Sequence, residues 1–82
     1  MKAFRSLGCS VQSLAAIGKG CPDLLVSCRG AQHLVEIKDG AKCASAQKLT
    51  ADQVRWHQGW KGQVHIVRSV SDAVDLVDGW AA

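Results

Sequence analysis

The chain has 82 residues, 48% hydrophobic and 21% charged, with a formal net charge of +3. This composition argues against a disordered segment, and the uncharged stretches are too short to span a membrane. We expect one folded domain over residues 1–82, located in the cytoplasm, because no apolar leader follows the basic start. The mild positive charge permits a polyanionic partner without requiring one.

Glycines divide the first half of the chain into short apolar runs. Residues 3–7 fit the end of a helix that Gly8 closes, and residues 9–14 alternate as a strand does. The strongest strand patterns are residues 23–28 (DLLVSC) and 33–38 (HLVEIK), which are rich in Val, Leu and Ile. We expect Gly30, at the first central position of a type II′ turn, to join these two strands as a hairpin.

The second half begins with a polar loop over residues 39–48. Thr50, followed three residues later by Gln53, forms a capping-box pattern, so a helix should start there and end near residues 59–62. Residues 63–68 (QVHIVR) then predict another strand.

A last helix should begin at Ser69 or Ser71 and carry Ala73 and Val77 on its apolar side. The expected order is therefore (α)βββαβα. This order predicts an α/β fold of the α+β type, a mixed sheet with helices packed on it.

The four cysteines are Cys9, Cys21, Cys28 and Cys43, and no two of them have the close C-x-x-C spacing that is usual in structural zinc sites. We expect free thiols that pack as small hydrophobic side chains.

The predicted hairpin brings charged side chains together. If Gly30 and Ala31 form its turn, Asp23 lies opposite Lys38 and diagonal to Glu36. Because side chains alternate along a strand, one face carries Asp23, Leu25, Glu36 and Lys38, and the other carries Leu24, Val26, Val35 and Ile37. A turn one residue longer or shorter would separate Asp23 from Glu36.

Two carboxylates and an ammonium group at one end of a hairpin suit divalent-metal chemistry. Asp23 and Glu36 can offer carboxylate oxygens to Mg²⁺, and the backbone carbonyl of Ile37 can offer a third oxygen. Lys38 can orient the attacking water or stabilise charge on a phosphate. The alternative is a surface ion pair between Asp23 and Lys38, with Glu36 as a solvated strand residue.

Pro22-Asp23 and Glu36-Ile37-Lys38 resemble the two parts of the PD-(D/E)xK nuclease signature. The later segment 48–53 (KLTADQ) with Trp56 is similar to the LT-x-x-Q-x-x-W segment of the virus-type replication-repair nuclease (VRR-NUC) family within that superfamily. The ordered set of these motifs extends the resemblance from about Gly8 to Ala73.

The resemblance implies a restriction-endonuclease-like core and a DNA endonuclease that uses Mg²⁺ or Mn²⁺ to hydrolyse phosphodiester bonds. It also implies a phage-encoded repair enzyme that forms homodimers and prefers branched DNA, such as four-way junctions or flaps. In the family, the glutamine at the position of Gln53 lies near the active-site lysine. The capping box with Thr50 is a second explanation for Gln53.

One departure from the family concerns the metal site. Members usually carry a glutamate in a helix before the first strand, whereas here no Asp or Glu precedes Asp23. The alternative function is therefore a catalytically weakened or inactive module that binds DNA junctions. A third possibility is a small interaction protein that dimerises through an exposed sheet edge.

Several other side chains are candidates for DNA contact. Lys42, Lys48, Arg55 and Lys61 can form a basic rim that contacts phosphates, and a scattered solvated surface is the alternative. Lys19 is a separate candidate for phosphate contact, with a solvated loop lysine as the alternative. His57 is a candidate for substrate contact, with a surface or packed histidine as the alternative. Trp56 and Trp60 are four residues apart and share a helical face, which favours core packing over base stacking.

Overall fold

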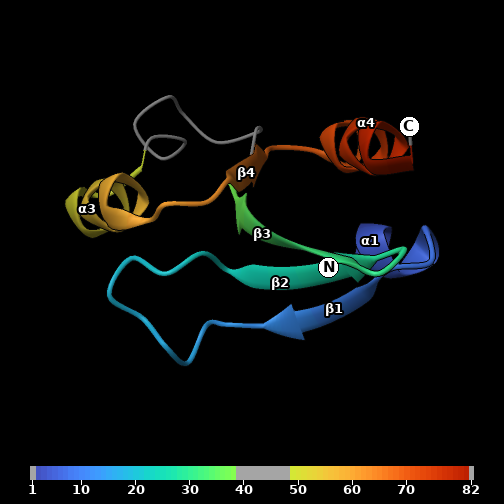
Figure 1. The fold of residues 1–82 in the computed structure, drawn as a ribbon. Coiled ribbons are helices and arrows are strands. Elements are labelled where there is room, and N and C mark those ends of the chain that lie inside the picture. Colours follow the sequence, from blue (N-terminus) through green and yellow to red (C-terminus); the bar gives the residue numbers. More distant parts are fainter. Residues whose placement is uncertain (1, 39–48, 82) are drawn as a thin grey trace.

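The computed structural model describes residues 2–38 and 49–81 (Figure 1). In chain order, the described elements are α1 (Lys2–Ser6), β1 (Ser10–Ser13), β2 (Leu24–Cys28), β3 (Ala31–Ile37), α3 (Ala51–Gly59), β4 (Val64–Val67) and α4 (Val70–Ala81). The strands form a mixed sheet of order β1-β2-β3-β4, in which only β3 and β4 run parallel. Over the described residues, the predicted order of helices and strands and the α+β class are confirmed.

The helix ends follow the local signals in the sequence. Gly8 closes α1 with a φ of 87°, the Gly8 amide donates to the carbonyl of Arg5, and the Cys9 amide donates to that of Phe4. This pair of bonds is the Schellman pattern expected of a C-terminal glycine. Thr50 and Gln53 form both bonds of the predicted capping box at the start of α3.

At α4, Ser69 provides the cap, because its hydroxyl accepts from the backbone amide of Asp72 at 3.1 Å. Across residues 2–38 and 49–81, every helix falls short of the length and apolar character that a membrane crossing requires. The polar loop predicted over residues 39–48 lies outside the described residues.

The hairpin turn differs from the prediction. Cys28 pairs with Ala31, so the turn residues are Arg29 and Gly30, whose φ angles of 54° and 81° are typical of a type I′ turn. The predicted type II′ turn was wrong because both central residues adopt the left-handed conformation. Continuing the pairing of Leu24 with Val35 places Asp23 opposite Glu36, not opposite Lys38 as predicted.

Each strand residue still lies on its predicted face of the sheet, because the observed register differs from the predicted one by an even number of residues. Leu24, Val26 and Val35 are buried on one face, as predicted. Ile37, predicted on the same buried face, is 39% exposed because it lies at the end of β3.

Helices α1 and α4 cover the buried face together and contact each other (Figure 1). Phe4 of α1 stacks at 6.2 Å on Trp80 of α4, which in turn stacks at 3.7 Å on His33 of β3. The core cluster contains Phe4, Cys9, Leu24, Val26, Cys28, Val35, Val67, Ala73 and Val77. Cys9, Cys21 and Cys28 are free thiols, and Cys9 and Cys28 are buried as expected for small hydrophobic residues.

A glycine loop attaches α3 to the rest of the fold. Gly20 has a φ of 84°, and a Cβ built on it would lie 2.2 Å from the backbone oxygen of Asp52 and 2.8 Å from the backbone nitrogen of Gln53. Only glycine permits the loop to approach the first turn of α3 so closely. This approach brings the start of α3 beside the residues that precede β2.

Replacing Gly20 with alanine therefore tests how α3 is held in place. We expect Gly20→Ala to lower the free energy of unfolding by more than Gly18→Ala, as measured by urea denaturation. Gly18 is the matched control, because its φ is 66° but a Cβ there meets nothing within 4 Å. The control should lose only the left-handed strain, about 1–2 kcal/mol. Equal losses in the two variants would contradict the close contact with α3.

Candidate functional site

Asp23 and Glu36 meet where β2 begins and β3 ends. Asp23 stands one residue before β2, and its Oδ2 accepts a hydrogen bond of 2.7 Å from the backbone amide of Ile37. This bond ties the Asp23 carboxylate to the backbone between Glu36 and Lys38. The Glu36 carboxyl lies within hydrogen-bond reach of Asp23. The two acidic residues predicted as a pair are therefore adjacent in space.

Glu36 is buried, with only 1% of its surface exposed, so the alternative of a solvated strand residue is wrong. Burial, the hydrogen bond with Asp23 and the charge of Asp23 raise the pKa of Glu36 from its ordinary 4.5 to about 8, against the opposing charge of Lys38. Its Oε1 has no hydrogen-bond partner among the described residues. A buried carboxyl oxygen with no partner is unusual in a folded protein.

Lys38 follows β3 directly and points toward α3. Its Nζ donates a hydrogen bond of 2.7 Å to Oε1 of Gln53, and the same oxygen accepts a bond of 2.9 Å from the backbone amide of Thr50. Gln53 therefore closes the capping box and holds Lys38 at once, so both explanations for this residue hold together. Lys38 forms no ion pair with Asp23, since within residues 2–38 and 49–81 the one salt bridge joins Arg55 and Asp52.

The carboxylate pair offers two of the ligands that a divalent-cation site needs. Two neighbouring carboxyl groups, one with a buried oxygen that has no partner among the described residues, repel each other when ionised, and a cation would relieve that repulsion. The donors are hard oxygens, which suit Mg²⁺ or Mn²⁺. The described residues contain no group of three or more His, Cys, Asp or Glu side chains, so water and substrate oxygens would complete the coordination shell.

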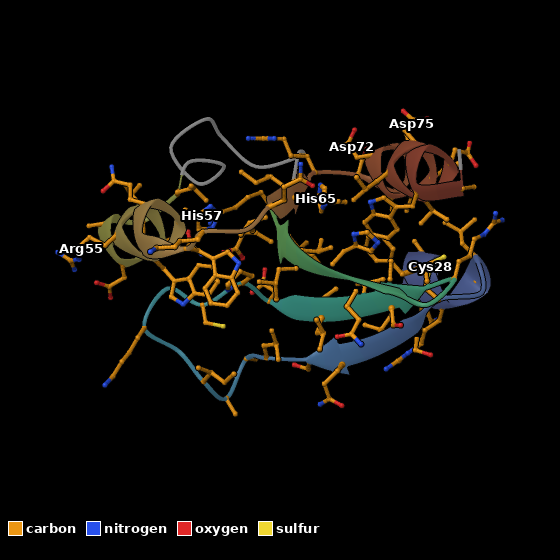
Figure 2. All side chains as sticks on the ribbon, in the orientation of Figure 1. Cys28, Arg55, His57, His65, Asp72 and Asp75 are labelled. Carbon is orange, nitrogen blue, oxygen red and sulfur yellow. The ribbon has the colours of Figure 1, made fainter. Side chains whose placement is uncertain are left out.

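Four of the residues predicted to contact DNA lie in the described part of the chain. Lys19 is exposed in the glycine loop with a φ of 56°. Arg55 is exposed on the outer side of α3 (Figure 2), where it pairs with Asp52. His57 lies half-buried on the same helix, and Lys61 is exposed beyond it. Lys42 and Lys48 lie outside the described residues.

The sequence did not indicate the positions of two neighbours of the site. Cys21 lies beside the carboxylates, and burial, together with the charges of Glu36 and Asp23, raises the pKa of its thiol. Gly20 positions α3 and hence Gln53. For Gly20, the sequence offered one indication of a role at the site, its position just before Cys21, Pro22 and Asp23. The structure places Gly20 in close contact with the first turn of α3.

Comparison with known proteins found no match among protein-family models, curated proteins or solved structures.

The raised pKa of Glu36 leads to a prediction about stability. A carboxyl whose pKa is higher in the folded state binds its proton more tightly there, so the free energy of unfolding should fall as pH rises from about 4.5 to about 8. Glu36→Gln keeps the shape and removes the charge, so it should flatten this dependence and stabilise the protein at pH 8. The measurement is chemical denaturation across that pH range in EDTA. A variant with the same pH dependence as the wild type would contradict the assignment.

Proposed function

We propose that the protein is a metal-dependent DNA endonuclease that hydrolyses phosphodiester bonds, with Asp23, Glu36 and Lys38 as its active centre. The observation that carries the proposal is the contact between Asp23 and the buried Glu36, with Lys38 held beside them by Gln53. We infer branched DNA as the substrate class and a homodimer as the working form from the resemblance to the VRR-NUC family.

The fold supports the proposal without identifying a family. A restriction-endonuclease-like core would present its carboxylates and lysine on a hairpin flanked by helices. The β2–β3 hairpin here, with α1 and α4 on one face and α3 beside the other end, is compatible with that arrangement.

Each residue has a definite part in the proposed reaction. Asp23 and Glu36 would hold Mg²⁺ or Mn²⁺ through carboxylate oxygens, and the Ile37 carbonyl would offer a further oxygen. The bound cation supplies charge neutralisation at the scissile phosphate and an acidified water. Lys38, positioned by Gln53, donates hydrogen bonds to a phosphate oxygen or to the attacking water.

A second candidate function is supported by one observation. Among the described residues, the carboxylate cluster contains two members, and the first turn of α1 contains no acidic residue. A site with fewer negative charges attracts a cation less strongly. A module that binds DNA junctions and cuts them slowly or not at all is therefore the alternative.

The cleavage assay uses labelled four-way-junction, flap and linear duplex DNA with Mg²⁺, with Mn²⁺ and with EDTA. We expect metal-dependent cutting that falls at least about a hundredfold in Asp23→Asn, Glu36→Gln and Lys38→Ala, because each variant removes a charged group at the reacting phosphate. Glu36 is changed to glutamine and not to alanine because it is buried and truncation would leave a cavity.

Asp75→Asn is the matched control for the charge change. Asp75 is an exposed carboxylate on α4 (Figure 2), and its loss should leave the rate unchanged. Junction binding without cutting by the folded wild type would favour the binding module. Cutting at the wild-type rate by Glu36→Gln would overturn the assignment of the site.

The double role of Gln53 can be separated by mutation. Thr50→Ala removes the cap, at a cost of about 1 kcal/mol in stability, but leaves the side chain that holds Lys38. Gln53→Ala removes the partner of Lys38 as well. We expect both variants to melt at lower temperature in a thermal unfolding scan, and only Gln53→Ala to lose most of its cleavage rate. Equal cleavage rates in the two variants would limit Gln53 to capping.

A further inference from the structure

A mostly apolar groove of about 560 Å³ lies against the sheet face that carries the carboxylates. Its base includes Leu25 of β2 and Leu34 of β3, which are directly paired across the hairpin. Trp56 and Trp60 line it from α3 and the residue after it. The groove also includes Gln32 and Gln63, both exposed, whose amide groups offer hydrogen-bond donors and acceptors.

The two tryptophans are not core residues, which corrects the packing role that their spacing favoured. Neither belongs to the buried core cluster, and Trp60 is 48% exposed. Their rings stack on each other with centroids 4.6 Å apart and planes 20° apart. An exposed aromatic face held rigid by a second ring is a platform on which a planar ligand can stack.

The groove lies next to the candidate active site on the same face of the sheet. The Leu25–Leu34 pair is the next pair along the same face from Asp23 and Glu36, a separation of about 7 Å along the strands. Cys21 lines the groove and also lies in the electrostatic field of both carboxylates. This separation is short enough for one nucleotide to place its phosphate at the carboxylates and its base in the groove.

We propose that this groove binds an unpaired nucleobase of the DNA substrate, stacked on Trp60, while the adjoining phosphate lies at the carboxylate pair. The proposal rests on the proposed nuclease function and makes it more specific. It implies that the protein cuts next to a nucleotide that is not base-paired, as in the single-stranded arm of a flap.

The chemistry of the groove favours a base over other planar or apolar ligands. Every nucleobase has an aromatic face for stacking and polar edges for amide groups, so aromatic platforms bind single strands with little sequence preference. The apolar groove adjoins the carboxylate pair on one sheet face, and a nucleotide likewise combines an aromatic base with a neighbouring phosphate anion. The net charge of +3 also suits a polyanion.

The test measures stacking in the absence of cleavage. A thymine oligonucleotide carrying one 2-aminopurine, a fluorescent base that is quenched when it stacks, is titrated with the protein in EDTA. We expect saturable quenching by the wild type and by Trp60→Phe, which keeps an aromatic ring. Trp60→Leu, which keeps only apolar surface, should bind about fivefold more weakly or worse. Val70→Ala, at an exposed apolar residue on α4, is the matched control and should bind as the wild type does.

The outcomes distinguish this inference from the nuclease proposal. Because EDTA removes the metal, quenching reports the groove whether or not the chain cuts DNA. Quenching that Trp60→Leu abolishes supports the groove even if no cleavage is found, and in that case only the nuclease proposal fails. Equal quenching by wild type and Trp60→Leu, with both shown to be folded by circular dichroism, would overturn the inference. Absence of quenching by the folded wild type would also overturn it.

Discussion

The register of β2 against β3 determines which side chains the candidate site contains. The two-residue turn at Arg29 and Gly30 pairs Leu24 with Val35, and one more step along the hairpin brings Asp23 to Glu36. A shift of one residue would move one carboxylate to the face that α1 and α4 cover. The hydrogen bond from the Ile37 amide to Asp23 then fixes the carboxylate at the end of the strand. The chemistry of the site thus depends on the backbone geometry of a turn at the opposite end of the hairpin.

The helix α3 completes the site through its first turn. Gly20 allows the loop before β2 to lie against the backbone of Asp52 and Gln53, and Gln53 reaches Lys38 from there. The capping box restrains the glutamine side chain, because its Oε1 also accepts from the amide of Thr50. Because the Gln53 side chain is already restrained, its hydrogen bond with Lys38 costs less conformational entropy than a bond to a mobile side chain would. Stability of the helix end and placement of the lysine are therefore coupled in one residue.

Much of this arrangement could be predicted from the sequence, because local signals determine it. Alternation in β2 and β3, the capping box at Thr50 and the glycine at the end of α1 gave the element order and the face that Asp23 and Glu36 share. The turn type was not predictable, since Arg29 adopts a positive φ that its side chain does not favour. The burial of Glu36, the contact of Gly20 with α3 and the exposure of Trp60 depend on tertiary packing. No single segment carries a signal for such contacts.

The central claim is that Asp23 and Glu36 form a divalent-cation site, and direct binding of Mn²⁺ to the purified chain tests it without DNA. Mn²⁺ is paramagnetic, so titration followed by electron paramagnetic resonance counts the bound ions. We expect one specifically bound Mn²⁺ per chain, lost in Asp23→Asn and in Glu36→Gln and retained in Asp75→Asn. Equal binding by the wild type and both site variants, or no specific binding by the folded wild type, would contradict it.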